Sequence, residues 1–151
     1  MARIYAVNFN EVAVSVQQDL FQIEAQTTPA ILHAIYLSQS TEEGDAEAEN
    51  LNVIIQRVTD AVTDDLNAVA LDGGDTAENA NLAINETSEL TTGASIIHAE
   101  SWNVAQSFIY LPPPELRPIV QIGNAIVVNL NNTPTDAITM SGTMYFEEIG
   151  N

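Results

Sequence analysis

Apolar and polar residues alternate in many short runs, and this pattern limits the possible folds more than any other feature of the sequence. In the run "DLFQIEA", residues 19–25, Phe21, Ile23 and Ala25 would share one face of a strand, with the residues between them on the other. A period of two residues is typical of β-strands with one buried face. We therefore expect a strand here, with the face of Phe21, Ile23 and Ala25 buried.

A longer apolar run, "AILHAIYLSQ" at residues 30–39, is rich in β-branched and aromatic residues. Such a run is typical of a central strand that is covered on both sides. The run 51–58 fits a strand and also one face of a helix. Its dense β-branched residues favour the strand, and a short helix is the alternative.

Strand patterns continue to the end of the chain: a weak one at 80–86, then "ASIIHAESW", "SFIYLP", "PIVQI", "AIVVNLN" and "AITMSGTMYFEEI". Gly123 and Asn124 separate two apolar runs and tolerate positive φ, so they predict a tight hairpin. The stretch "NNTPTD" predicts the last turn.

Together these runs predict an all-β fold of about eight to ten strands, with no clear helix. An antiparallel β-sandwich, jelly-roll-like, fits this number of strands, and an immunoglobulin-like sandwich is the alternative, because the pattern does not fix the strand order. We expect residues 1–151 to form a single β-sandwich domain. A long acidic loop region is expected at about 41–92, where turn formers and carboxylates are concentrated.

The charge balance limits the possible partners. Twenty-one acidic residues face three arginines, Arg3, Arg57 and Arg117, which gives a formal net charge of −18, while 46% of the residues are hydrophobic. The hydrophobic content predicts a folded chain. Phosphate binding depends on Lys and Arg, so we expect neither nucleic acid nor a membrane as partner. No apolar run approaches the ~18 residues of a membrane span, and we expect synthesis in the cytoplasm without a signal peptide.

Few residues suggest catalysis or a cofactor. His98 and Glu100 would share a strand face and could hold a metal together with His33, as in cupins. Oxygen-rich stretches at 42–49 and 72–75 could bind calcium, although neither has EF-hand spacing. No G-x-S-x-G motif and no cysteine is present. We therefore expect no enzymatic activity and no cofactor, with a cupin-like metal protein as the alternative.

The stretch "YLPPPELRP" predicts a stiff link between two strands, because proline fixes φ and donates no backbone hydrogen bond. A pre-ordered link lowers the ordering cost of an interface. Arg117 would pair with Glu115 or with a carboxylate of a neighbouring subunit. The candidate interface residues are Trp102, Tyr110, Pro112, Pro113, Pro114, Glu115 and Arg117. The alternative is pairing within the chain, with Trp102 and Tyr110 in the core.

Four stretches carry a family resemblance: "QDLFQI" (18–23), "ESWNV" (100–104), "YLPPPELRP" (110–118) and "SGTMYFEEIG" (141–150). They resemble small virion structural proteins of tailed bacteriophages, most of all capsid decoration, or cement, proteins. The resemblance implies a β-rich homotrimer without enzymatic activity that binds the major capsid protein between capsomers, on the outer capsid surface of the virion. The acidity agrees with a position away from packaged DNA.

Two other functions remain open. The same resemblance permits a tail or head–tail component of the virion. The fold class also permits a jelly-roll carbohydrate-binding module, in which Trp102, Tyr110 and Tyr145 would form a stacking platform and the acidic loops would bind calcium.

Overall fold

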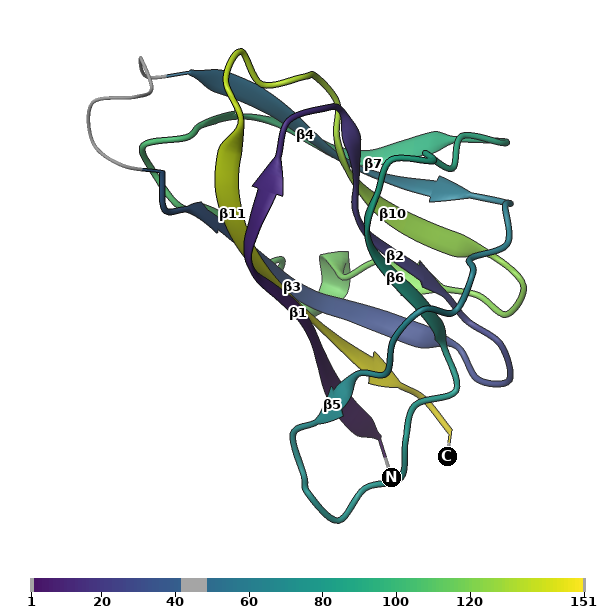
Figure 1. The fold of residues 1–151 in the computed structure, drawn as a ribbon. Coiled ribbons are helices and arrows are strands. Elements are labelled where there is room, and N and C mark those ends of the chain that lie inside the picture. The colour runs from purple at the N-terminus through teal and green to yellow at the C-terminus, as the bar shows by residue number, and fades with distance from the viewer. Residues whose placement is uncertain (1, 42–48, 151) are drawn as a thin grey trace.

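The computed structural model describes residues 2–41 and 49–150. These residues form eleven strands and one short 3₁₀-helix (Figure 1). The strands are β1 (Arg3–Val14), β2 (Gln18–Glu24), β3 (Ala30–Gln39), β4 (Asn50–Val58), β5 (Val69–Ala70), β6 (Asn81–Glu86), β7 (Ser95–Asn103), β8 (Phe108–Tyr110), β9 (Ile119–Val120), β10 (Ala125–Leu130) and β11 (Ile138–Glu148), and the helix is η1 (Pro114–Leu116). The predicted all-β class is confirmed.

The strands form two antiparallel sheets that lie face to face (Figure 1). The larger sheet has the order β5-β1-β11-β3-β8, with β9 also paired to β3, and the smaller sheet has the order β6-β2-β10-β4-β7. β8 and β9 pair with successive parts of β3 and so form one interrupted edge strand. β5 and β6 are additions at the sheet edges, and β8 with β9 counts as one strand. When the eight strands that remain are renumbered 1 to 8 along the chain, the two sheets have the orders 1-8-3-6 and 2-7-4-5, which is the strand order of a jelly roll.

One hydrophobic core fills the space between the sheets. The Phe9 ring of the larger sheet lies 5.3 Å from the Phe21 ring of the smaller one, and Tyr5 stacks on Phe146 at the same centroid distance. β11 alternates strictly between buried and half-buried residues, as its period of two predicts. Gly142 interrupts this row because a Cβ there would lie 2.7 Å from the Phe9 ring. The aromatic ring thus occupies the space of the missing side chain.

The smaller sheet is covered on both faces over β2 and β10. Every residue of β2 and of β10 is buried, whereas we expected only one face of residues 19–25 to be so. The reason is a second apolar cluster on the outer side, where Val62 and Leu90, from segments between strands, pack against β4, β6 and β10. The chain's own loops therefore cover the outer face of this sheet over β2 and β10 and leave β7 exposed.

Carboxylates hold these and other loops of the chain in place. Eight of them accept hydrogen bonds from backbone N–H groups, mostly of residues outside the strands: Asp19, Glu24, Glu49, Asp60, Asp64, Asp72, Glu78 and Glu148. Glu24 Oε2 accepts from Val62 N at 2.8 Å, and Asp19 Oδ2 accepts from Leu90 N at 2.9 Å. A charged acceptor makes a strong hydrogen bond to an N–H group that has no strand partner. The expected acidic loop region thus contains β4, β5 and β6, and several of its acids are structural.

Three local predictions are settled by the structure. The strand at 51–58 is confirmed as β4, and β3 is central in its sheet. The outer side of β3 is not covered as expected, because Tyr36 and Ser38 are exposed.

The hairpin predicted at Gly123 and Asn124 is wrong. Gly123 does have a φ of 77°, and Asn124 N donates to Gln121 O at 3.0 Å. This turn, however, leads from β9 of the larger sheet to β10 of the smaller one. A local turn signal does not tell whether the flanking strands pair with each other.

Two further points concern the possible calcium stretch and membrane spans. Most of the possible calcium stretch at 42–49 lies outside the described residues. No helix in the part of the chain that the structure describes is long and apolar enough to cross a membrane.

Candidate interaction surface

The outer face of the larger sheet is open. We call it the open face and define it by the outward-pointing residues Ile4, Ala6, Asn8 and Asn10 of β1, Ser141, Thr143, Tyr145 and Glu147 of β11, Ile31, His33, Ala34, Tyr36 and Ser38 of β3, Ile109 of β8 and Ile119 of β9. The register sets them in transverse rows, such as Asn8, Thr143, Tyr36 and Ile109. Four strands therefore contribute to one continuous surface.

Apart from its tyrosines, the open face has only two ionisable residues, although the chain carries 21 acids. They contact each other, since His33 Nε2 and Glu147 Oε2 lie 2.6 Å apart. A register shift between β11 and β3 gives β3 one extra residue, so that His33 and Ala34 can both face outward. The charge of Glu147 is therefore partnered, and the rest of the face carries no charge.

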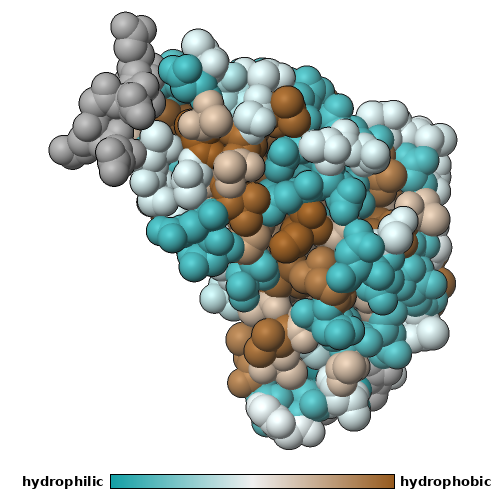
Figure 2. Space-filling view, viewed as in Figure 1, coloured by the Kyte–Doolittle hydropathy of each residue, from teal (hydrophilic) through white to brown (hydrophobic). Residues whose placement is uncertain are grey.

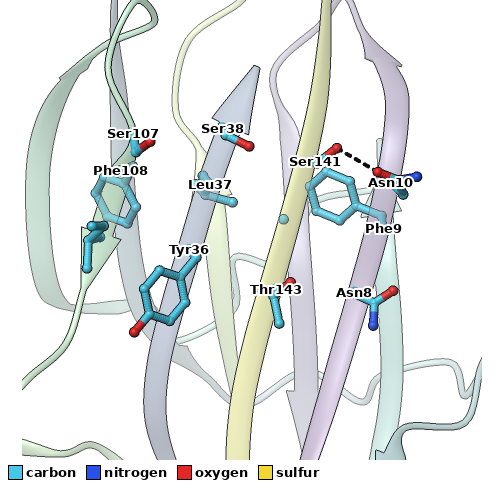
Figure 3. Close-up of a pocket in the computed structure, with 12 residues that line it drawn as sticks. Asn8, Phe9, Asn10, Tyr36, Leu37, Ser38, Ser107, Phe108, Ser141 and Thr143 are labelled. Atoms are coloured by element: carbon cyan, nitrogen blue, oxygen red, sulfur yellow. Dashed lines mark hydrogen bonds between the residues drawn. The ribbon is translucent and has the colours of Figure 1, made fainter. Parts of the chain in front are cut away.

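A hollow of about 520 Å³ lies on this surface, across β1, β11, β3 and β8 (Figure 3). Asn8, Thr143 and Tyr36 line it in one row, and Asn10, Ser141 and Ser38 in the next (Figure 3). Ser141 Oγ donates to Asn10 Oδ1 at 3.1 Å. The lining offers amides and hydroxyls around apolar side chains, a composition that suits contact with another polypeptide.

Exposed hydrophobic side chains gather on the larger sheet. Eight of the twelve large hydrophobic side chains that are exposed in the described residues belong to this sheet and to the adjoining link: Ile4, Tyr36, Val69, Leu71, Ile109, Leu111, Leu116 and Ile119. Figure 2 shows hydrophobic surface over β5, at the lower left of the view. Apolar patches of this kind mark sites of association on soluble proteins.

The proline-rich link projects from one edge of this sheet. We call residues 111–118, between β8 and β9, the proline corner. Pro113 has φ −61° and ψ 158°, and η1 follows it. The predicted extended link outside the sheet ladder is therefore confirmed, with one 3₁₀ turn added. Pro112 is buried, whereas Pro113, Pro114 and Glu115 are exposed.

Arg117 does not make the local ion pair that was one of our expectations. Its Nε donates to Pro112 O at 3.4 Å, and no carboxylate within residues 2–41 and 49–150 lies at ion-pair distance from it. The guanidinium is half-buried. Within the described residues its charge therefore has no acidic partner.

Trp102 and Tyr110 lie in the core, as the alternative for these two residues held. Trp102 is 3% exposed and donates from Nε1 to Gln106 O at 2.6 Å. Tyr110 is 9% exposed, its ring lies 4.7 Å from that of His98, and burial raises the pKa of its hydroxyl. Neither residue offers contact surface in the single chain. The sugar-stacking platform that would use them with Tyr145 is absent for the same reason.

The two histidines do not form a shared site. His98 lies 3.1 Å from Glu100, as their spacing predicts, but His33 is on the other sheet with Glu147. Within the described residues there is no group of three or more His, Cys, Asp or Glu that could hold a metal ion. In the stretch 72–75, Asp72 Oδ1 accepts from Gly74 N at 2.9 Å, and Asp75 lies 3.8 Å from Arg3.

Reasoning from the sequence did not find the open face. One signal was present: every second residue from 139 to 145 is Thr, Ser, Thr and Tyr, without a charge, in a strongly acidic chain. An outward-facing row without charges in such a chain indicates a surface that another molecule covers.

Comparison with known proteins assigns the chain to no family. No family model matches the chain, and no curated protein is significantly similar to it. The "Structure of infectious bursal disease virus Gx strain" matches at 19% identity and a TM-score of 0.22, over 100% of this chain and 41% of that one. The T13 IBDV viral particle matches at 10% identity and a TM-score of 0.22, over 99% of this chain and 40% of that one. The chain spans about two fifths of the length of these proteins, and scores this low establish no relationship.

Proposed function

We propose that this protein is a non-enzymatic structural protein of a virion, which binds the outer capsid surface between capsomers as a decoration, or cement, protein. The observation that carries the proposal is the open face, a wide sheet surface with exposed isoleucines and one partnered charge in a chain of charge −18. The major capsid protein is the proposed partner. We infer this partner from the four sequence stretches that resemble phage virion proteins.

The distribution of charge supports an outer position. Carboxylates on the rest of the molecule repel packaged nucleic acid, and the chain has only three cationic residues for contacts with DNA phosphates. The same carboxylates disfavour contact with other acidic surfaces and leave the uncharged face as the favourable one for docking. Many symmetric copies, each with a modest contact, would together stabilise a shell against internal pressure. Self-association as a homotrimer is part of the proposal.

Cryo-electron microscopy of particles of the virus that encodes this chain tests the proposal directly. The expected result is density for the jelly roll on the outside of the shell, with the open face against the major capsid protein. Density in the tail or at the head–tail junction would replace the proposal with the other virion role. Absence from the particle, or a position against the packaged genome, would overturn it.

A matched pair of variants tests the surface itself. Ser38→Asp puts a carboxylate on the open face, and Ser101→Asp puts one on exposed β7 of the smaller sheet. We expect the first to lower the occupancy of particles by about tenfold, since a like or unpaired charge at an interface costs on the order of 1.4 kcal/mol or more. The second should bind like the wild type. Equal binding of both variants would exclude the open face as the contact.

A further inference from the structure

Two exposed apolar patches lie at opposite edges of the larger sheet. At the β5 edge, Val69 is 63% and Leu71 58% exposed, and at the proline corner Leu111 is 61% and Leu116 68% exposed. The register places both patches at the same end of the sheet, because Leu71 N bonds to Ile4 O and a row of paired residues runs from Ile4 through β11 and β3 to β9. Two copies side by side would therefore bring the proline corner of one to the β5 edge of the next.

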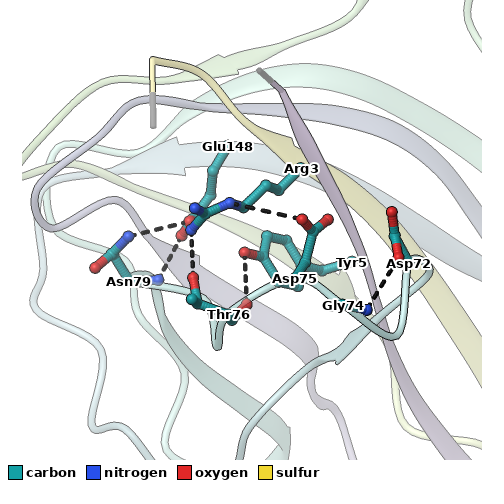
Figure 4. Close-up of polar contacts among 8 residues, drawn as sticks. All are labelled: Arg3, Tyr5, Asp72, Gly74, Asp75, Thr76, Asn79 and Glu148. Carbon is teal, nitrogen blue, oxygen red and sulfur yellow. Dashed lines mark hydrogen bonds and ion pairs between the residues drawn. The ribbon is translucent and has the colours of Figure 1, made fainter.

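The β5 edge contains a hollow that can receive a side chain. It measures about 190 Å³ and is lined by Ala2, Ile4, Leu71, Asp72 and Asp75. Figure 4 shows the acidic side of this region, where Asp75 pairs with Arg3. Asp72 is exposed, and within the described residues its carboxylate accepts only from the backbone N–H of Gly74. The hollow thus combines apolar walls with a carboxylate that has no cation beside it.

The proline corner has the complementary features. Leu116 is the most exposed large hydrophobic side chain of the described residues, and it precedes Arg117, whose guanidinium has no carboxylate within reach in the described chain. In a chain of charge −18 two copies repel each other, so a contact between copies is favourable only where apolar surface and one of the three cations lie together. The corner is such a place.

We propose that copies of this chain associate head to tail, with Leu116 of one copy in the β5 hollow of the next and Arg117 of the first beside Asp72 of the second. The contact uses two different surfaces, so repetition produces a closed ring when the rotation between copies closes, and an open chain otherwise. This inference deepens the self-association in the proposed function. It does not depend on binding to a capsid.

The first test measures mass by sedimentation velocity, at ionic strengths of about 0.1 and 1 M and protein concentrations up to roughly 1 mM, at which even a millimolar contact is populated. We expect multimers of the wild type, more stable at high salt because the repulsion between acidic copies is screened. Leu116→Asp and Leu71→Asp should each be monomeric. Ile96→Asp, a control on β7 at 62% exposure, should associate like the wild type. A monomeric wild type, or variants at residues 71 and 116 that associate normally, would overturn the proposal.

Mixing the two monomeric variants separates a head-to-tail contact from a symmetric one. The Leu116→Asp protein keeps an intact hollow and the Leu71→Asp protein keeps an intact corner, so an equimolar mixture should give a one-to-one dimer and nothing larger. A mixture that stays monomeric would exclude the proposed contact. Far-ultraviolet circular dichroism and the melting temperature of each variant show that both proteins are folded.

A charge reversal tests the polar part of the contact. Arg117→Glu and Asp72→Arg should each weaken association by about tenfold or more, and the double variant should recover most of the loss, because the pair is restored with opposite orientation. No recovery would exclude the pairing of these two residues. Association that persists while particles do not bind the protein would contradict the proposed capsid role and leave the head-to-tail contact standing.

Discussion

The two outer faces of the jelly roll differ in what covers them. On the smaller sheet the protein's own loops cover β2 and β10, and six of the seven buried polar residues of the described chain lie on this sheet: Gln18, Asp19, Gln22, Glu24, Gln56 and Asn129. The larger sheet has no such cover, and its outer face carries isoleucines, tyrosines, amides and hydroxyls in contact with solvent. This difference between the two faces is the reason for proposing the open face as the docking surface.

Carboxylates have different roles on the two outer faces. On the smaller sheet they are hydrogen-bond acceptors for loops, as Asp19 is for Leu90 and Glu24 for Val62. On the open face the one acid, Glu147, is paired with His33. Carboxylates therefore hold loops in place on the outer side of the smaller sheet, whereas the open face has a single carboxylate. Four experiments can test this comparison.

The largest effect is expected from a charge under the covered face. Val127 is fully buried on the outer side of β10, so Val127→Asp places a carboxylate in an apolar cluster, and we expect a loss of about 3 to 5 kcal/mol in the free energy of unfolding. Thr143→Asp on the open face should cost about 1 kcal/mol or less, because the new carboxylate reaches water. Urea denaturation of both variants measures the two losses in the free energy of unfolding. Similar losses would mean that the two faces do not differ as described.

Removal of one loop-holding acid should have an intermediate effect. Glu24→Ala leaves Val62 N without its acceptor in a buried position, and an unsatisfied buried donor costs about 1 to 3 kcal/mol. Glu147→Ala removes only the contact with His33 at the open face and should cost about 1 kcal/mol or less. Amide hydrogen exchange should show faster exchange at Val62 in the first variant alone. Unchanged exchange there would contradict the role of Glu24 as a clamp.

The pH dependence of stability distinguishes the covered face in a third way. Burial raises the pKa of Asp19 against the opposing effect of its hydrogen bonds, and burial together with Asp65 raises the pKa of Glu86. Between the ordinary and the raised pKa values the native state binds more protons than the unfolded chain, so stability falls as pH rises through this window. Acidification from about pH 7 to about pH 5 should therefore raise the urea midpoint, and relief of the overall negative charge acts in the same direction.

Asp19→Asn isolates the buried group from the overall charge. This variant loses one titrating carboxyl of the covered face, so its midpoint should change less with pH than that of the wild type. Glu115→Gln removes an exposed acid from the proline corner and should keep the slope of the wild type. A steeper slope for Asp19→Asn would contradict the raised pKa of this residue.

The sequence predicted the strands better than it predicted what covers them. Period-two alternation located β2 and β11, and apolar runs rich in β-branched residues located β3, β4 and β10, because both patterns depend only on local burial and residue type. The turn at Gly123 was found and its role was missed, since turn residues report local φ and not the sheet that each flanking strand joins. The cover over β2 and β10 depends on Val62 and Leu90 returning from distant segments, which no local pattern encodes.

The candidate surface shows the same limit. The exposed prolines at 113 and 114 and the unusual place of Arg117 were recognised from residue type alone. Trp102 and Tyr110 were placed among the surface candidates because aromatic residues favour interfaces, but they are equally favoured in cores, and the fold buries both. Which face of a strand meets water is decided by topology.

The smallest effect is expected at the proline corner, where the substitutions change the stiffness of the backbone and keep the contacting side chains. Pro114 is exposed and begins η1, so Pro114→Ala should change the free energy of unfolding by about 0.5 to 1 kcal/mol, mainly through greater freedom of the unfolded chain. A looser corner must be ordered when it binds, so Pro114→Ala should weaken association modestly and Pro114→Gly by more, up to about tenfold. Titration of the three proteins in sedimentation experiments gives this series. Because neither substitution removes Leu116 or Arg117, equal affinities of all three would show that these side chains alone carry the contact and that the prolines serve the fold.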